Sequence, residues 1–253
     1  MIEAKELGKD YGSLPAVKGL NLTVLPGELF GFLGPNGAGK STTIRMLAGL
    51  LKPSRGTAIV AGFDVLKEPL EVKRRIGYMA ESPYLYTKLT GREFLSFMGD
   101  LYGVKPAVAS ERADRLLALF ELADKADELV EGYSHGMRQK LALAGTLLHE
   151  PQLLFLDEPT SGLDPRSARV VKDLLVGLAE RGHTVFLSTH ILEIAQHMCH
   201  RVGIVDRGEL VAVGSLEELR REARAGQASL EELFLQLTGG AEARDLATYL
   251  EGS

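Results

Sequence analysis

A glycine-rich segment at residues 34–41, Gly-Pro-Asn-Gly-Ala-Gly-Lys-Ser, constrains the fold more than any other part of the sequence. It matches the pattern G-x-x-x-x-G-K-[ST] of a phosphate-binding loop, in which glycines let backbone N–H groups converge on anionic oxygens. Apolar residues 29–33 predict a buried strand before it, and residues 42–50 predict a helix after it. The positive end of that helix would face the phosphates. This order favours an α/β nucleotide-binding core over a plain glycine turn.

Each residue of this loop is a candidate for binding a nucleotide. We expect Lys40 to reach the β- and γ-phosphates and the Ser41 hydroxyl to ligate Mg²⁺. The other candidates from the loop and the first turn of the helix are Gly34, Pro35, Asn36, Gly37, Ala38, Gly39 and Thr42.

A second motif is a run of four apolar residues, 153–156, followed by Asp157 and Glu158. The run predicts a central parallel strand that ends in two carboxylates. In P-loop enzymes an Asp at this strand end holds Mg²⁺, and the neighbouring Glu158 is placed to polarise a water aimed at the γ-phosphate. An isolated acidic pair would be a solvated turn, but the phosphate-binding loop favours the catalytic interpretation.

The remaining patterns divide the chain into a core and a helical insertion. The expected strands are 2–7, 20–25, 29–33, 56–60, 76–79, 153–156, 184–188, 202–205 and 209–213. The expected helices are 42–50, 68–75, 90–102, 107–122, 134–149, 165–181, 216–225 and 229–237. We therefore predict an ATP-binding core with an antiparallel β unit at 1–82 and 150–215, a helical subdomain at 83–149, and a C-terminal helical extension at 216–253.

Composition limits the compartment and the partners. A net charge of −5 argues against a general electrostatic grip on nucleic acid, and we predict no nucleic-acid partner. One cysteine excludes an intramolecular disulfide and fits a reducing compartment. We find no signal-type segment at the start and no apolar run near the roughly 18 residues that span a bilayer. We expect a cytoplasmic protein whose membrane part, if any, belongs to a partner.

With these motifs in this order, the chain resembles the ATP-binding subunit of an ABC transporter over about residues 2–215. Residues 157–164, Asp-Glu-Pro-Thr-Ser-Gly-Leu-Asp, match the strand-end acids and the D-loop that follows them. Residues 133–140, Tyr-Ser-His-Gly-Met-Arg-Gln-Lys, sit where the family carries its signature. His190 matches the switch histidine, and Tyr11 occupies the place of an aromatic that stacks on adenine.

The resemblance implies a P-loop NTPase fold, with a RecA-like core, a small antiparallel β unit and an inserted α-helical subdomain. It also implies a head-to-tail dimer with two ATP molecules between the subunits, and we expect the second subunit to be a copy of this chain. Each site would combine one subunit's phosphate-binding loop with Ser134 and Gly136 of the other. His190 would contact the γ-phosphate and orient Glu158.

Two positions depart from the family pattern. Glu81 stands where the family usually carries a glutamine, and we hypothesise that it approaches Mg²⁺ or its water shell. The signature reads Ser-His-Gly-Met instead of Ser-Gly-Gly-Gln, which leaves the roles of His135 and Met137 open. These variants resemble the branch that serves export permeases. Residues 82–86 would line the groove for the permease, or would be an ordinary packing loop.

The sequence therefore predicts a Mg²⁺-dependent ATP hydrolase, peripheral on the cytoplasmic face of the membrane, that powers export through a separate integral membrane permease. The alternative is a soluble ABC ATPase that acts on nucleic acid or the ribosome. Such proteins carry coiled-coil insertions, tandem cassettes or metal fingers, by resemblance. A non-hydrolysing regulatory dimer would require the loss of Glu158 or His190, and both are present.

Overall fold

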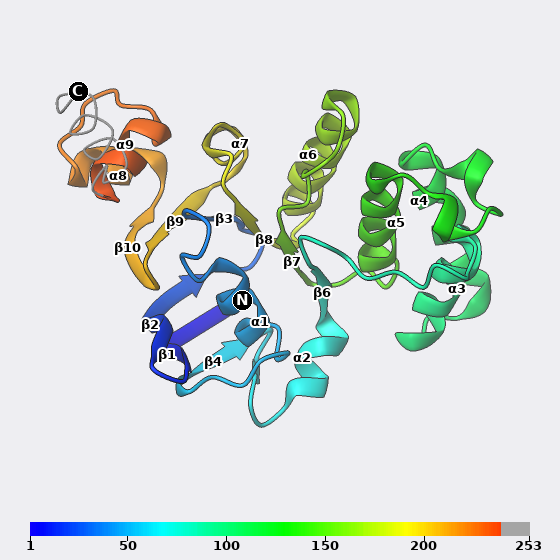
Figure 1. Cartoon of the computed structure of the whole chain (residues 1–253), viewed down its shortest axis with the longest axis horizontal. Coiled ribbons are helices and arrows are strands. Elements are labelled where there is room, and N and C mark those ends of the chain that lie inside the picture. The colour runs from blue at the N-terminus through cyan, green and yellow to red at the C-terminus, as the bar shows by residue number, and fades with distance from the viewer. Residues whose placement is uncertain (239–253) are drawn as a thin grey trace, which may run out of the picture.

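Two β-sheets of different type form the centre of the protein (Figure 1). The structure is a computed structural model that describes residues 1–238, so the end of the predicted C-terminal extension, 239–253, lies outside the described residues. The six-stranded sheet has the order β10-β9-β3-β8-β7-β6, and its strands are β3 (Leu29–Leu33), β6 (Ile76–Met79), β7 (Leu153–Asp157), β8 (Thr184–Thr189), β9 (Arg201–Asp206) and β10 (Glu209–Gly214). The four-stranded sheet has the order β2-β1-β4-β5, with β1 (Ile2–Tyr11), β2 (Leu14–Val24), β4 (Arg55–Val60) and β5 (Phe63–Asp64).

The strands β3, β7 and β8 are buried along their whole length, which explains their continuous apolar sequence. Phe186 lies at the centre of this core, with its ring centroid 5.2 Å from that of Phe32 and 5.5 Å from that of Phe155. The strands pair in parallel, with Leu33 opposite Thr189 and Asp157 opposite Ser188. Their carboxyl ends therefore meet at one edge of the sheet.

The antiparallel strands β1 and β2 are longer than the predicted strands at residues 2–7 and 20–25. The predicted end of β1 and the predicted start of β2 were therefore wrong. The first half of β2 was not predicted because it contains Pro15 and Gly19, which are unfavourable in most strands. Proline is tolerated here because β2 is an edge strand. The ladder contains register shifts, and Glu6 has a φ of 50° at one of them. Such a bulge interrupts the alternation on which a strand prediction depends.

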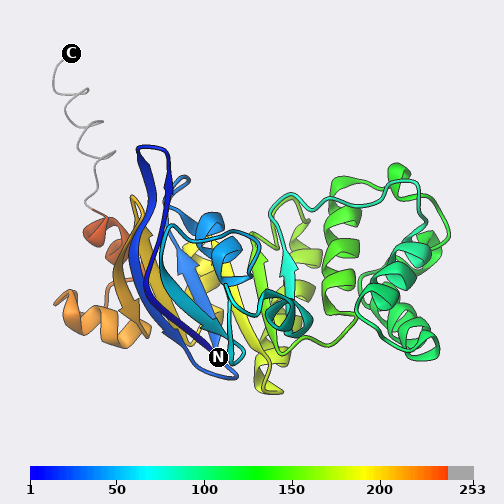
Figure 2. The ribbon, with the colours of Figure 1, turned by 90° about the horizontal axis from the view of Figure 1, so that it is seen from below.

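Helices cover both faces of the six-stranded sheet (Figures 1 and 2). These helices are α1 (Lys40–Leu47), α2 (Pro69–Arg75), α6 (Pro165–Glu180), α7 (Leu192–Met198), α8 (Leu216–Glu222) and α9 (Leu230–Leu237). The last two begin with capping boxes at Ser215 and Ser229. Helix α9 contributes the buried Leu230 and Leu233 and packs against both α7 and α8. None of the helices within residues 1–238 is sufficiently long and apolar to cross a membrane.

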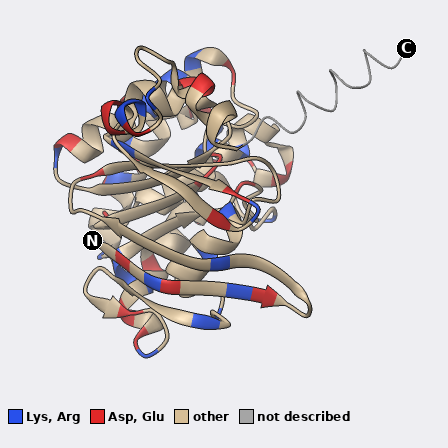
Figure 3. Cartoon of the chain, turned by 90° about the vertical axis from the view of Figure 1, so that its left-hand side faces the viewer, with Lys and Arg blue, Asp and Glu red and all other residues tan. Residues whose placement is uncertain are grey.

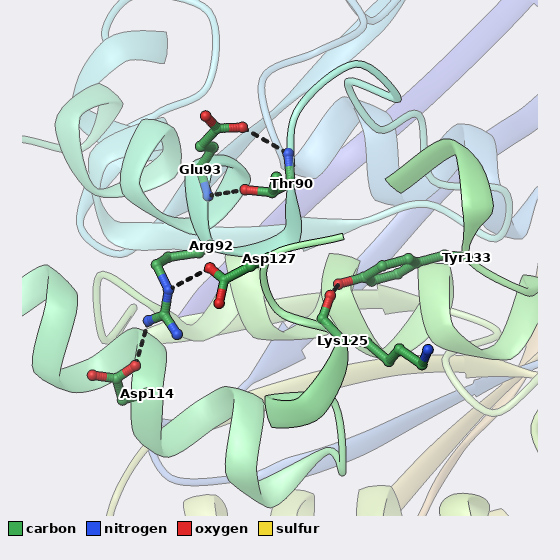
Figure 4. Close-up of polar contacts among 7 residues, drawn as sticks. All are labelled: Thr90, Arg92, Glu93, Asp114, Lys125, Asp127 and Tyr133. Atoms are coloured by element: carbon green, nitrogen blue, oxygen red, sulfur yellow. Dashed lines mark hydrogen bonds and ion pairs between the residues drawn. The ribbon is translucent and has the colours of Figure 1, made fainter. Parts of the chain in front are cut away.

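The helical insertion lies beyond β6 and β7 and contains α3 (Gly91–Leu101), α4 (Pro106–Leu119) and α5 (His135–Leu147), with short 3₁₀ turns at Ala123–Lys125 and Val130–Gly132. Figure 4 shows the polar contacts that join these elements. Thr90 and Glu93 exchange hydrogen bonds at the start of α3 and so form a capping box. Arg92 pairs with both Asp114 and Asp127, and Tyr133 donates from its hydroxyl to the Lys125 carbonyl over 2.6 Å. These contacts fix the segment that leads into α5.

His149 joins the helical insertion to the core just after α5. Its Nε2 lies 3.0 Å from the Ile76 carbonyl oxygen, at the start of β6, and its ring stacks on Tyr102 with centroids 3.6 Å apart. Burial lowers the pKa of this imidazole below its ordinary value of 6.5; the hydrogen bond to Ile76 opposes the shift and Arg112 adds to it. The folded protein therefore favours neutral His149.

We expect acidification to destabilise the fold partly through His149. As the pH falls below 6.5, the unfolded chain binds a proton that the folded chain resists, so the free energy of unfolding decreases. The variant His149→Gln keeps an N–H donor for Ile76 but does not titrate, so it should lose less thermal stability between about pH 7.5 and pH 5.5. Calorimetric melting of both proteins measures this, and identical losses would contradict the assignment.

Candidate nucleotide-binding site

A cavity of about 330 Å³ lies at the carboxyl edge of the six-stranded sheet. Its lining residues are Ala16, Asn36, Gly37, Gly39, Lys40, Ser41, Thr42, Glu81, Asp157 and Glu158. All but Ala16 were predicted as site residues, although these predicted residues come from three separate segments of the sequence. Ala16, on β2, brings the antiparallel sheet against the phosphate-binding loop.

The loop before α1 has a shape that only glycine permits at two points. Gly39 has a φ of 99°, and a Cβ built there would lie 2.5 Å from the Ala16 carbonyl oxygen. A Cβ on Gly34 would collide with the carbonyl oxygen of Val205. The loop is therefore held between β2 and the hairpin of β9 and β10, which turns its backbone toward the cavity.

Lys40 is the buried cation of the cavity. Its Nζ donates to the carbonyl oxygens of Gly34, at 2.7 Å, and Pro35, at 3.2 Å. Burial lowers the pKa of Lys40 from its ordinary value, while the charges of Glu158, Asp157 and Glu81 oppose that shift. The ammonium group thus lies inside the loop that would surround a phosphate.

Three carboxylates share the cavity with this one ammonium group. Asp157 and Glu158 are buried and Glu81 is exposed, and like charges at such proximity favour a cation that neutralises them. The hydroxyl of Ser188, opposite Asp157 in the sheet, is buried without a hydrogen-bond partner. Within residues 1–238, no group of three or more His, Cys, Asp or Glu side chains could hold a metal ion alone. The donor set fits Mg²⁺, which takes few protein ligands and completes its shell with phosphates and water.

Glu158 is held by side chains from β8 and the segment after it. Its Oε2 accepts a hydrogen bond from Thr189 over 3.2 Å, and its Oε1 lies 2.8 Å from Nδ1 of His190. Glu158 also has a φ of 50°, and its N–H donates to the Ser188 carbonyl over 3.0 Å. The structure thus brings together Glu158 and His190, as the resemblance implied, with the carboxylate fixed at both oxygens.

The remaining predicted residues lie outside the lining of this cavity. Tyr11, at the end of β1, is 49% exposed, and its ring lies 5.4 Å from Nζ of Lys9. Ser134 caps α5 by accepting a hydrogen bond from Met137 N–H over 3.3 Å, and Gly136 lies in the next turn. Neither Ser134 nor Gly136 contributes to the lining of this cavity.

Comparison with known proteins identifies the family to which this cavity belongs. The family model described as ABC transporter matches residues 17–161. The chain belongs to the ABC transporter family. This confirms the resemblance seen in the sequence. The ABC cassette fold is confirmed too, since the solved structure "Structure of ATP binding subunit of ABC transporter" is similar with a TM-score of 0.90 and 34% identity, covering 94% of this chain and 99% of that one.

Two curated ABC proteins are similar in sequence. The daunorubicin/doxorubicin resistance ATP-binding protein DrrA of Streptomyces peucetius is 48% identical over 219 residues, which are 87% of this chain and 66% of DrrA. The probable multidrug ABC transporter ATP-binding protein YbhF of Escherichia coli (strain K12) is 40% identical over 94% of this chain and 41% of YbhF. The chain thus spans less than two thirds of either relative.

A further solved ABC structure, "Dimeric Structure of MJ0796, a Bacterial ABC Transporter Cassette", is similar with a TM-score of 0.79 and 28% identity. It covers 85% of this chain and 99% of the MJ0796 chain.

Sequence reasoning gave no role to Thr189 or Gln139. Thr189 accepts a hydrogen bond from Ile191 N–H over 3.1 Å while it donates to Glu158. Gln139, in α5, is 1% exposed and donates to the Glu158 carbonyl over 3.4 Å. The signal for Thr189 was available, because a hydroxyl at the end of a buried strand needs a partner.

We expect Thr189→Val to slow ATP turnover about tenfold, because the loss of one hydroxyl frees the Glu158 carboxylate and leaves Ile191 N–H unpaired. ATP affinity should stay within about twofold, since Thr189 does not line the cavity. Thr189→Ser keeps the hydroxyl and serves as the matched control. Steady-state turnover and equilibrium nucleotide binding measure both effects; equal turnover of the two variants would show that the hydroxyl does not act on Glu158.

Proposed function

We propose that the chain hydrolyses Mg²⁺-ATP and thereby drives export of a substrate through a separate integral membrane permease. The observation that carries the proposal is the buried Glu158, fixed by Thr189 and His190 beside the phosphate-binding loop. The names of two relatives support the export role. One is a daunorubicin/doxorubicin resistance protein, and the other is a probable multidrug transporter protein.

Each group in the cavity has a chemical task in this proposal. Glu158 accepts a proton from the water that attacks the γ-phosphorus in line with the leaving oxygen. His190 and Thr189 keep that carboxylate oriented, and Lys40 neutralises charge on the β- and γ-phosphates. Ser41 and Asp157 would hold Mg²⁺, with Glu81 at its water shell, and the ion would supply further charge neutralisation.

The proposal includes a second copy of this chain, because the cavity of one subunit lacks the signature residues. The start of α5, capped by Ser134, would complete the partner's site with backbone N–H groups and the positive end of the helix. The gamma-phosphate oxygens would then contact both subunits. The dimeric form of the similar MJ0796 cassette supports this arrangement.

The segment after β6 is the proposed contact with the permease. Tyr84 is 98% exposed and Tyr86 is 57% exposed, and with Arg138 they line a groove of about 370 Å³. Tyr86 also packs edge-on against Phe97 in the helical insertion, with centroids 5.2 Å apart. Exposed aromatic side chains beside a groove favour a protein contact over simple loop packing. A permease bound in this groove would hold the chain at the cytoplasmic face of the membrane.

The alternative is a soluble ABC ATPase that acts on nucleic acid or the ribosome. The net charge of −5 does not favour it, and on the face shown in Figure 3 basic residues alternate with acidic ones. The purification of the Glu158→Gln variant with ATP distinguishes this function from transport.

We expect Glu158→Gln to bind ATP and remain as a closed dimer, because the amide cannot accept the proton of the attacking water. Purified with ATP from detergent-solubilised native membranes, the variant should retain a polytopic membrane protein in equimolar amount. Lys40→Ala, which removes the buried cation of the cavity, is the matched control and should retain none. Mass spectrometry of the retained proteins gives the result.

The other outcomes of this purification are informative. Ribosomal proteins or nucleic acid without a membrane protein would replace the transporter proposal with the soluble alternative. A Glu158→Gln variant that turns over ATP at the wild-type rate would contradict the assignment of Glu158 as the base.

We expect Tyr84→Glu to abolish retention of the permease, because a charge in the groove would have to be buried at the contact. The variant Leu70→Glu, which introduces the same charge at a 67% exposed apolar residue on α2 outside the groove, should not affect permease retention. Both substitutions are made in the Glu158→Gln background and measured by the same purification. Equal permease retention by the Tyr84 variant and its parent would exclude this groove.

A further inference from the structure

The signature segment and the D-loop of the same chain touch each other through His135. His135 is the first residue of α5, and Gly162 lies in the loop between β7 and α6. A Cβ built on Gly162 would come within 2.6 Å of Nε2 of His135 and would also collide with Cδ2. The imidazole edge therefore occupies the space beside the Gly162 backbone.

The backbones of the two segments are also close. A Cβ on Gly136 would lie 3.5 Å from the Gly162 carbonyl oxygen and 3.7 Å from a methyl group of Leu163. Four residues after His135, Gln139 donates to the Glu158 carbonyl. The first turns of α5 thus contact the loop from Glu158 to Leu163 at both of its ends.

Hydrogen bonds hold this loop at each end. Ser161 N–H donates to the Glu158 carbonyl over 3.1 Å, and Leu163 N–H donates to the Thr160 carbonyl over 3.3 Å. Asp164 caps α6 by accepting from Ser167 N–H over 3.0 Å. Gly162, with a φ of 70°, lies between these fixed points. A push on Gly162 from His135 must therefore act on the backbone of Glu158 or on α6.

We propose that His135 is a positioning residue that couples the two ATP sites of the dimer. ATP held by the signature segment of one chain would press His135 against Gly162 and so set the position of Glu158, which serves the other site. This inference rests on the proposed function, because only in a head-to-tail dimer do these two segments of one chain serve different sites. It gives a role to a signature residue that departs from the family pattern.

The first test compares His135→Gly, His135→Gln and the wild type in steady-state ATP hydrolysis. The glycine variant removes the contact and should lower kcat about fivefold and bring the Hill coefficient from above 1 to near 1. Its KM should change less than about twofold, because the variant keeps the Ser134 hydroxyl and the backbone N–H groups of α5 that are proposed to contact the partner's ATP. The amide of His135→Gln can reach the position of Nε2, so this variant should recover most of the cooperativity. A purely structural role of His135 would not lower kcat and the Hill coefficient while KM stays nearly unchanged.

The second test uses Gly162→Ala in the wild-type and His135→Gly backgrounds. In the wild type the new Cβ meets the imidazole, whereas without His135 only the positive φ remains unfavourable. Gly103→Ala is the matched control, since Gly103 has a φ of 69° and no atom within 4 Å of a built Cβ. Gly162→Ala should cut kcat at least tenfold in the wild type and less than about twofold in the His135→Gly background. The decrease in thermal midpoint that Gly162→Ala causes in the His135→Gly background should equal the decrease that Gly103→Ala causes in the same background.

Three results would overturn the inference. They are unchanged kcat and Hill coefficient in His135→Gly, equal effects of Gly162→Ala in both backgrounds, and a wild-type Hill coefficient near 1 in a chain that dimerises with ATP. Failure of the proposed function is separate, because the Glu158→Gln variant would then not form a dimer with ATP in size-exclusion chromatography.

Discussion

The parallel, in-register pairing of β3, β7 and β8 is the constraint on which the rest of the site depends. It places the end of β3, Asp157 and Thr189 at one edge of the sheet, although β3 ends more than a hundred residues before the other two in sequence. The phosphate-binding loop, the acidic pair and the switch histidine all leave the sheet at this edge. A slip of one residue between β7 and β8 would turn Thr189 away from Glu158.

The second constraint is electrostatic. Burying Asp157 and Glu158 beside Lys40 costs free energy of desolvation, and the lowered pKa of Lys40 shows that burial outweighs the favourable charges around it. Hydrogen bonds from Thr189 and His190 recover part of that cost at Glu158. A site that carries unbalanced charge in a fixed geometry gains most when an anionic ligand arrives with a divalent cation, and this would be the physical basis for the proposed selection of metal-bound nucleotide.

How far the sequence predicts this structure depends on the range of the interactions. The loop at residues 34–41, the buried strand before Asp157 and the capping box at Thr90 could be predicted because each depends on neighbouring residues. The full length of β2 could not, because Pro15 is acceptable only on an edge strand, and the position at the edge is a property of the assembled sheet. The same holds for Gln139, whose partner Glu158 is distant in sequence and was visible only in the folded chain. The contact of His135 with Gly162 follows from packing and has no sequence pattern.

The helix α5 and the residues just after it contact the core at two separate places. The helix is 13 residues long, or about 20 Å. Its first turns touch Gly162 and the Glu158 carbonyl, while His149, beyond its last turn, bonds to Ile76 in the strand that leads to Glu81. A rotation of the helical insertion would therefore displace the Glu158 loop and the β6 segment together. Because Glu81 and Glu158 line the same cavity, one movement of α5 would alter the position of two carboxylates around the nucleotide.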